Sequence, residues 1–368
     1  MNILILDNSI GITGALKAII DTVEPLKEKH NFIFVLQNES TVTEYVKSKG
    51  FKTYNLKFTE VSKSVTKNIF YPFQLVYNSI KLYQIAKKES INIIEVNDLY
   101  NLTGNLTKLF LNVKLITHVR RMPESFPLFI YKIWCAIHVK QSDLILPVSN
   151  ANARIFHEHK KVVVLYDPIV KETKKFEYTI QTKKKLTILY LANYTRGKGQ
   201  NNLIDFISEY IKEYNSTNFC VKFVGFDFDL KNNQNYKEEL TTQIKDLKLD
   251  DFFIVGNGAK NIYNEIKEAD IMLNLSDSES LSRVTMEALY FGIPIIATNV
   301  GGTNEMIEDN VNGYLIEKGD VKDFNKKLND LINNEMTRKS MSEKKNLVAI
   351  KFNSEKISKK LEELYLNL

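Results

Sequence analysis

Two series of short apolar runs, separated by longer amphipathic stretches, constrain the fold of this chain more than any other feature. The first series covers residues 2–6, 32–37, 91–96, 113–117 and 144–148, and the second covers 186–192, 219–225, 252–256, 271–275 and 294–299. The intervening stretches, such as 14–23 and 75–88, have a helical spacing of apolar residues. Buried strands alternating with helices predict an α/β fold built on parallel, doubly wound sheets.

A polar segment divides the two series and predicts two domains. Residues 171–185 are rich in lysine and lack the apolar periodicity of a core element. We therefore expect Rossmann-like domains at 1–170 and 171–350, followed by a terminal helical segment at 351–368. The 368 residues are enough for two domains with sizeable cores.

Several functional classes have little support in the sequence. The longest apolar runs fall short of 18 residues, and an acidic residue, Asp7, comes too early for a signal peptide, so we expect a cytoplasmic protein. The two cysteines, Cys135 and Cys220, lack metal-ligand spacing and are expected to be buried free thiols.

The charge is divided unevenly along the chain. Residues 1–170 hold 21 Lys and Arg against 14 Asp and Glu, whereas the rest holds 29 against 30. Part of the excess flanks the aromatic run 69–80, in a set comprising Lys57, Lys63, Lys67, Lys81, Lys87 and Lys88. Such a segment can lie on an anionic membrane surface. The alternative is that these lysines solubilise an ordinary amphipathic helix; a nucleic-acid interface lacks any supporting motif.

The segment 276–294 carries the strongest chemical signal. It places two carboxylates, Glu279 and Glu287, eight positions apart across a predicted helix start. Ser282 is the expected N-cap, 283–291 the helix, and Gly292 the residue that ends it. The backbone amides of residues 280–284 would then face an anion held beside Glu279. A carboxylate beside an anion site suits a nucleotide sugar.

The same segment resembles the retaining glycosyltransferases of glycosyltransferase family 4. The family signature pairs two Glu residues eight apart with a following Ala and Gly-x-Pro, which Glu279, Glu287, Ala288, Gly292 and Pro294 match. The resemblance continues through the Gly-Gly turn and Glu of 295–307 and the Gly-Tyr-Leu of 312–316. It implies a GT-B fold, in which two Rossmann-like domains face a cleft and the last helix crosses back to the first domain.

A second element is expected to bind the donor diphosphate. Arg196 and Lys198 lie in a strand-to-helix loop, at the edge where open α/β sheets bind ligands. Lys198 matches a family lysine. The family arginine is replaced here by Asn193 or Ala192, so Arg196 is the candidate substitute.

The resemblance assigns the remaining roles. Diphosphate binding falls to Arg196, Lys198, Ser280, Leu281, Ser282, Arg283, Gly11 and Gly14; ribose and base binding to Glu287, Gly256 and Asn257; and catalysis to Glu279 and His118. Gly11 and Gly14 form a turn that is not the G-x-G-x-x-G fingerprint of dehydrogenases. Arg120 and Arg121 are weaker candidates for an anionic acceptor.

The expected activity is retaining, metal-independent transfer of a hexose from a nucleotide diphosphate sugar, with UDP favoured, to a lipid-linked or oligosaccharide acceptor. The implied role is synthesis of bacterial surface polysaccharide, such as capsule or lipopolysaccharide, with no cofactor and no metal site. Two alternatives stay open, a nucleotide-sugar epimerase of the same architecture and a non-catalytic donor-binding subunit. A glycoside hydrolase would leave the phosphate-binding elements without a purpose.

Overall fold

The computed structural model describes residues 1–37, 41–58, 71–169, 185–226, 230–258 and 261–368. The chain forms two compact units. Unit 1 comprises residues 1–170 and 352–368, and unit 2 comprises residues 171–351. We describe each unit by itself.

Unit 1 is built on a six-stranded parallel sheet with the order β3-β2-β1-β4-β5-β6. Its strands are β1 (Asn2–Asp7), β2 (Asn31–Gln37), β3 (Lys52–Leu56), β4 (Ile93–Val96), β5 (Lys114–Val119) and β6 (Leu144–Pro147). Its helices are α1 (Gly14–Val23), α2 (Val42–Ser48), α4 (Tyr71–Lys88), α5 (Thr103–Lys108), α6 (Leu128–Gln141), α7 (Asn150–Ala153) and α15 (Ser354–Leu366), with short 3-10 turns at Glu24–Leu26, Pro123–Ser125 and Arg154–Phe156.

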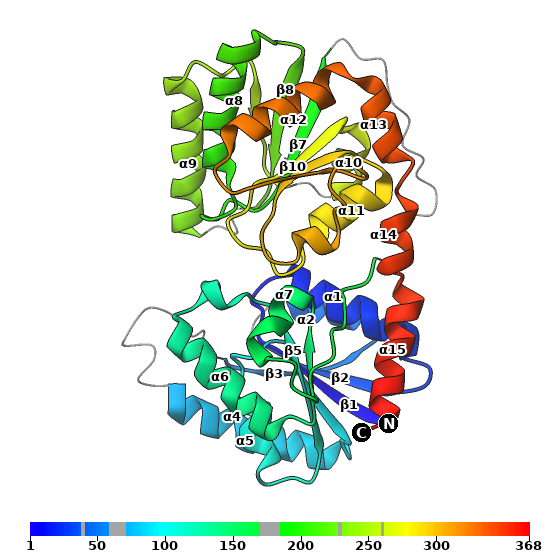
Figure 1. Ribbon diagram of the computed structural model, residues 1–368. Helices are drawn as coiled ribbons and strands as arrows, with labels where there is room; N and C mark the ends of the chain where they lie inside the picture. Colours follow the sequence, from blue (N-terminus) through cyan, green and yellow to red (C-terminus); the bar gives the residue numbers. More distant parts are fainter. Residues whose placement is uncertain (38–40, 59–70, 170–184, 227–229, 259–260) are drawn as a thin grey trace. The chain divides into compact units, whose positions relative to one another are not determined.

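The two faces of this sheet are covered by different helices. On one face, Leu82 and Ala86 of α4 join the sheet residues Leu4 and Val96 in one apolar cluster. On the other face, α15 lies beside α1, although the two helices are far apart in the sequence (Figure 1). The Ser358 hydroxyl of α15 donates to the carbonyl of Thr22 in α1 at 2.7 Å.

Unit 2 repeats the architecture, with the sheet order β12-β11-β10-β7-β8-β9. Its strands are β7 (Leu186–Leu191), β8 (Phe219–Val224), β9 (Phe253–Val255), β10 (Ile271–Asn274), β11 (Ile295–Thr298) and β12 (Tyr314–Ile316). Its helices are α8 (Gln200–Tyr214), α9 (Lys231–Asp246), α10 (Ile262–Glu268), α11 (Arg283–Phe291), α12 (Val321–Asn333), α13 (Glu335–Ser342) and α14 (Asn346–Lys351), with a 3-10 turn at Thr303–Glu305.

The predicted α/β class with two doubly wound parallel sheets is confirmed, and two edge strands were missed. Four of the five residues of β3 are exposed or half-buried and its sequence, Lys-Thr-Tyr-Asn-Leu, lacks a continuous apolar run, and β12 has only three residues. In each sheet the strand order reverses between the first and fourth strands, which are β1 and β4 in unit 1 and β7 and β10 in unit 2. Ligands of open α/β sheets bind at the carboxyl ends of the strands at such a point.

Two smaller predictions concern cysteines and membrane crossing. Cys135 is buried, Cys220 is half-buried, and both are free thiols. Among the helices that the structure describes, none combines the length and the apolar character needed to cross a bilayer.

Candidate active site

Helix α11 begins and ends where its sequence predicts. The hydroxyl of Ser282 accepts a hydrogen bond from the backbone amide of Thr285, which caps the helix start. Gly292 ends the helix in the left-handed conformation, with φ of 75°. The preceding residues, Ser280 and Leu281, lead from Glu279 into the first turn, so the open amides of the helix lie within a few residues of that carboxylate.

Lys198 and Glu279 form an ion pair at the carboxyl edge of the sheet in unit 2. The Nζ of Lys198 lies 2.8 Å from Oε1 of Glu279, and the side chains are 37% and 13% exposed. Lys198 follows β7 and Glu279 follows β10, so the pair lies where the strand order reverses. A cation and a carboxylate that remain partly accessible can bind a polar ligand at this edge.

The loop that carries Lys198 is held against the loop after β10. The Tyr190 hydroxyl donates to the carbonyl of Lys198 and accepts from the amide of Leu275 at 2.8 Å. A Cβ atom at Gly199 would lie 2.0 Å from the Leu275 carbonyl oxygen, so only glycine permits this approach. Burial keeps Tyr190 protonated by raising its pKa, which preserves its role as a donor.

The Gly-Gly turn after β11 fixes the backbone of Glu279. The amide of Gly302 donates to the Glu279 carbonyl at 3.0 Å. Gly301 has a φ of 51°, and a Cβ there would lie 1.7 Å from the same oxygen. The sequence indicated this turn only as part of a family pattern, and its contact with Glu279 was not foreseen.

Glu287 lies one helical turn beyond Arg283, on the same face of α11. The guanidinium of Arg283 is 3.9 Å from Oε1 of Glu287, and both side chains are largely buried, at 16% and 12% exposed. The spacing of four residues predicted this shared face. The structure therefore brings Lys198, Glu279, Arg283 and Glu287 to one end of the sheet in unit 2.

Arg196 does not join this group in the structure. Its guanidinium binds both carboxylate oxygens of Glu239, at 2.7 and 2.5 Å, and lies 5.1 Å from the centre of the Tyr236 ring on α9. Gly197, with φ of 86°, turns the backbone between Arg196 and Lys198, so the two cations contact different partners. The expected pairing of Arg196 with Lys198 at one diphosphate is therefore not what the structure shows.

Gly256 and Asn257 follow β9, at the same edge of the sheet. The Tyr194 hydroxyl donates to the Gly256 carbonyl, and the Asn257 side chain accepts from Lys237. The predicted role of Gly256 and Asn257 at the nucleotide stays a prediction. Sequence patterns did not indicate a nearby aromatic group, Phe226, whose ring lies 2.1 Å from where a Cβ of Gly258 would stand.

In unit 1, Gly11 lies in the turn between β1 and α1, and Gly14 is the first residue of α1. The Thr13 hydroxyl caps the helix by accepting from the Leu16 amide at 3.2 Å. A Cβ at Gly11 would meet no atom within 4 Å among the described residues, so packing does not require glycine there. The expected approach of this turn to the donor remains a prediction.

The structure corrects the prediction for His118. Its ring is buried, at 1% exposed, and Nε2 is hydrogen-bonded to the carboxylate of Glu95 on β4. The other oxygen of Glu95 accepts from the Tyr365 hydroxyl of α15 at 2.6 Å. This buried triad joins the last helix to the sheet, so His118 has a structural position with no exposed surface for a sugar.

Arg120 is also committed to an internal contact, whereas Arg121 is exposed. Arg120 is buried and its guanidinium binds Asp167 and Asn97, each at 2.5 Å, which leaves it no free charge for an acceptor. The Arg121 side chain is 55% exposed and lies over the ring of Tyr100 at 5.2 Å. Arg121 therefore stays a candidate and Arg120 does not.

A metal centre was not expected from the sequence. Within the described ranges, no group of three or more His, Cys, Asp and Glu side chains is arranged to hold a metal ion.

Comparison with known proteins gives this geometry a biochemical context. Residues 170–348 match the model of the family described as glycosyl transferases group 1. The N-acetyl-alpha-D-glucosaminyl L-malate synthase of Bacillus anthracis is 24% identical over 336 residues, covering 85% of this chain and 84% of its own. A Campylobacter jejuni enzyme, N-acetylgalactosamine-N,N'-diacetylbacillosaminyl-diphospho-undecaprenol 4-alpha-N-acetylgalactosaminyltransferase, is 23% identical, with 95% of each chain covered.

Solved structures give the same fold. Alr3699/HepE from Anabaena, in complex with UDP and glucose, superposes with a TM-score of 0.84 at 18% identity, covering 100% of both chains. At this identity the likeness establishes the fold alone. Together, the family match over unit 2, the relatives and the shared architecture identify the chain as a glycosyltransferase with the GT-B fold.

Proposed function

We propose that the chain is a retaining hexosyltransferase that uses a nucleotide diphosphate sugar, with UDP as the nucleotide. The observation that carries the proposal is the accessible pair of Lys198 and Glu279 beside the start of α11. Lys198 and the amides of residues 280–283 would bind the diphosphate, Glu279 the sugar hydroxyls, and Glu287 the ribose. UDP is also the nucleotide in the Anabaena complex.

The chemistry follows from where charge develops. The bond between the anomeric carbon and the phosphate oxygen breaks, so negative charge grows on the diphosphate, where Lys198 and the helix amides stabilise it. An acceptor hydroxyl forms the new bond on the same face of the sugar, and its proton passes to the departing phosphate oxygen. The products are the nucleoside diphosphate and the glycosylated acceptor, with the anomeric configuration retained.

The direct test is donor binding combined with transfer. Calorimetric titration with UDP, GDP and ADP should give the tightest binding for UDP, and a panel of UDP-hexoses should release UDP in the presence of acceptor. Nuclear magnetic resonance of the product should show the donor's anomeric configuration. Isomerisation of the donor without acceptor would favour the competing epimerase, and binding without turnover would favour a non-catalytic subunit.

We further propose that the reaction needs no metal ion. The residues at this edge include Lys198 and Arg283, cations that can meet phosphate charge in place of a metal. Activity should therefore persist in excess EDTA. Loss of activity that Mg²⁺ or Mn²⁺ restores would contradict the proposal.

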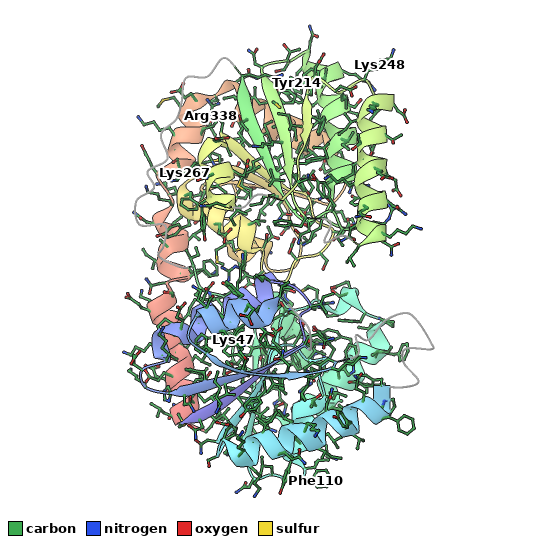
Figure 2. All side chains as sticks on the ribbon, turned by 180° about the vertical axis from the view of Figure 1, so that it is seen from behind. Lys47, Phe110, Tyr214, Lys248, Lys267 and Arg338 are labelled. Carbon is green, nitrogen blue, oxygen red and sulfur yellow. The ribbon has the colours of Figure 1, made fainter. Side chains whose placement is uncertain are left out.

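The proposed acceptor is lipid-linked or an oligosaccharide, in synthesis of a surface polysaccharide such as capsule or lipopolysaccharide. The name of the Campylobacter jejuni relative includes a diphospho-undecaprenol acceptor. Unit 1 exposes large apolar side chains on neighbouring helices: Phe73, Val76, Tyr77 and Ile80 on α4, Leu109 and Phe110 after α5, and Leu128, Phe129 and Ile133 on α6. Figure 2 shows Phe110 projecting outward from unit 1.

Lysines accompany this apolar surface, which favours an anionic membrane as its partner. Lys87 and Lys88 are exposed on α4, and Lys132 is exposed on α6. Each lysine near an anionic surface contributes about 1 kcal/mol. Lys63, Lys67 and Phe70, which belong to the same prediction, lie outside the described residues. A location at the inner face of the plasma membrane stays a prediction.

Liposome flotation tests this surface. The wild type should float with vesicles containing anionic lipid and release them as salt is raised. Replacing Phe73, Tyr77 and Phe129 by Ser should reduce the floating fraction, whereas the matched replacement of Ile254 and Met336, exposed apolar residues of unit 2, should not. Equal flotation of all variants, or flotation independent of lipid charge, would contradict membrane docking.

A further inference from the structure

A buried hydrogen-bond network joins the two ends of the loop that carries Glu279. It consists of Asn274, Ser276, Ser282 and Thr285, all of them buried, and we call it the Asn274 network. Asn274 is the last residue of β10, and Ser276 lies two positions further on. Ser282 caps α11, and Thr285 lies in its first turn. The network therefore links the end of a strand to the start of a helix.

The side-chain amide of Asn274 uses its whole hydrogen-bonding capacity inside this network. Its Oδ1 accepts from the backbone amide and the hydroxyl of Ser276, at 3.2 and 2.8 Å. Its Nδ2 donates to the hydroxyl oxygens of Ser282 and Thr285, at 3.0 and 2.9 Å. A side-chain amide offers two acceptor positions and two N–H groups, so Asn274 has no bond left for a ligand.

The orientation of the Asn274 amide is fixed by the backbone. Because the Ser276 N–H can only donate, Oδ1 must face Ser276 and Nδ2 must face the two hydroxyls. Those hydroxyls, of Ser282 and Thr285, are also hydrogen-bonded to each other at 3.0 Å. A buried network in which every bond of the amide is satisfied favours a single arrangement. Asn274 therefore fixes where the loop leaves the sheet relative to where α11 begins.

Neighbouring contacts hold the same loop at other points. The Thr298 hydroxyl on β11 donates to the Ser276 carbonyl at 2.6 Å. The Tyr190 hydroxyl accepts from the Leu275 amide, and the Gly302 amide donates to the Glu279 carbonyl. The backbone of this loop is thus held at its start and its middle by other residues, whereas Asn274 ties its start to its end.

We propose that Asn274 is a positioning residue of the transferase, which sets the distance between the Glu279 carboxylate and the first amides of α11. The proposal rests on the function proposed above, in which the carboxylate binds the sugar and the amides bind the diphosphate. Both groups then act on one donor molecule, on either side of the bond that breaks. A misplacement of about 1 Å can lower the rate of such a reaction roughly 100-fold.

The variant Asn274→Leu tests the proposal, because leucine keeps the number and branching of the side-chain heavy atoms and removes all four hydrogen bonds. Ser282 can still cap α11, so UDP affinity, measured by calorimetry, should change by less than about threefold, whereas turnover should fall about tenfold or more. Turnover is measured as UDP released from UDP-glucose, UDP-galactose and the two corresponding UDP-N-acetylhexosamines, with water in place of the acceptor.

A double-mutant cycle with Glu279→Ala distinguishes positioning from a general effect on the fold. Without the carboxylate there is nothing for Asn274 to position, so adding Asn274→Leu to Glu279→Ala should lower turnover by less than about twofold more. A further loss of about tenfold in the Glu279→Ala background would overturn the proposal, because the two residues would then act independently.

A second pair of variants serves if Asn274→Leu does not fold. Thr285→Val keeps the shape of the side chain but removes the hydroxyl to which Asn274 donates, and Thr285→Ser restores that hydroxyl. Turnover should fall in Thr285→Val and recover in Thr285→Ser, with UDP affinity nearly constant. Equal turnover in both variants would count against the network.

The matched control is Asn325→Leu. Asn325 is a buried residue of α12 whose Nδ2 donates to Glu213 of α8 at 2.9 Å. This variant should unfold at a lower urea concentration than the wild type, as Asn274→Leu should, but keep wild-type turnover. If Asn274→Leu lost stability and also kept wild-type turnover, the network would serve the fold alone and the proposal would be overturned.

Failure of this proposal can be told apart from failure of the proposed function. A wild type that neither binds UDP nor releases it from the UDP-hexoses would overturn the proposed function, and the role of Asn274 with it. A wild type that does both, with unchanged turnover in Asn274→Leu and Thr285→Val, would overturn the role of Asn274 alone.

Discussion

The two units share one strand order but differ in the chemistry of the loops where that order reverses. In unit 2 these loops follow β7 and β10 and carry the charged pair of Lys198 and Glu279. In unit 1 the equivalent loops follow β1 and β4, where the Tyr100 hydroxyl donates to the Asn8 side chain at 3.1 Å. The same scaffold thus presents a partly accessible ion pair in unit 2, whereas the hydrogen bond between Tyr100 and Asn8 in unit 1 joins neutral groups.

Unit 1 holds two of its basic side chains near this edge in buried contacts with carboxylates. The guanidinium of Arg120 binds Asp167, and His118 is bonded to Glu95. The basic excess of the first half of the chain is therefore not gathered at its strand ends but includes exposed lysines such as Lys87 and Lys88. Net charge alone therefore does not indicate a binding site at the strand ends of unit 1.

The largest expected effect concerns Glu279 in unit 2. Glu279→Ala should lower turnover by roughly 100- to 1,000-fold, the range seen when one group that stabilises a transition state is removed. UDP affinity should be nearly unchanged, because the proposed partner of this carboxylate is the sugar and not the nucleotide. A transfer assay beside UDP calorimetry checks this, with Glu335→Ala, an exposed glutamate of the same unit, as control. If Glu279→Ala turned over as fast as the wild type, Glu279 and its ion pair with Lys198 would have no role in catalysis.

Acid should destabilise unit 1 through a histidine, a residue type that unit 2 lacks. Burial lowers the pKa of His138 from 6.5 to about 4. The unfolded chain therefore binds a proton more readily than the folded protein between these values, so the stability from neutral His138 is full above pH 6.5 and is lost as the pH falls to 4. The loss is about 3 kcal/mol.

Urea unfolding at pH 7 and pH 4 measures this contribution. The difference in unfolding free energy between the wild type and His138→Gln should shrink by about 3 kcal/mol at the lower pH. Burial also lowers the pKa of His30, which adds to the acid sensitivity of the wild type in the same direction. If the difference in unfolding free energy between the wild type and His138→Gln stayed constant with pH, His138 would bind protons equally well in the folded and the unfolded protein.

Local chemistry made part of the site predictable from the sequence. Ser282 and Gly292 bound α11 as expected, because capping preferences depend on a few neighbouring residues. The position of Lys198 and Glu279 at one sheet edge followed from the rule for strand ends, although 81 residues separate them.

Contacts between segments that are distant in the chain could not be predicted from local sequence patterns. Tyr365 meets Glu95 across 270 residues, and no local pattern indicates that α15 would cover the face that holds His118. Gln74 and Asn101 carried no signal either, since they are neutral residues of common types that only the fold brings to one small cavity. Sequence patterns therefore identified charged motifs on one loop more readily than neutral groups gathered from several elements.

A moderate effect is expected at Glu287, which should separate nucleotide binding from sugar transfer within unit 2. Glu287→Ala should weaken UDP binding by about 1.5–3 kcal/mol, because the charged hydrogen-bond partner proposed for the ribose is lost. Turnover at saturating donor should fall much less than in Glu279→Ala. Calorimetric UDP affinities and donor KM values of the variant and the wild type test this prediction. An unchanged UDP affinity in Glu287→Ala would mean that Glu287 does not bind the ribose.

The smallest effect is expected at Arg196, where the structure and the sequence disagree. Its side chain is 69% exposed and paired with Glu239, which is 54% exposed, and such surface pairs contribute at most about 1 kcal/mol. Arg196→Ala should therefore change UDP affinity and turnover by less than about threefold, whereas Lys198→Ala should reduce both by tenfold or more. Glu239→Ala, which frees the guanidinium without removing it, is the matched control and should behave as the wild type. If Arg196→Ala weakened UDP binding as strongly as Lys198→Ala, the guanidinium would have to leave Glu239 when the donor binds. In that case the sequence, which placed Arg196 with Lys198 at the diphosphate, would describe the donor-bound state better than the ion pair with Glu239 does.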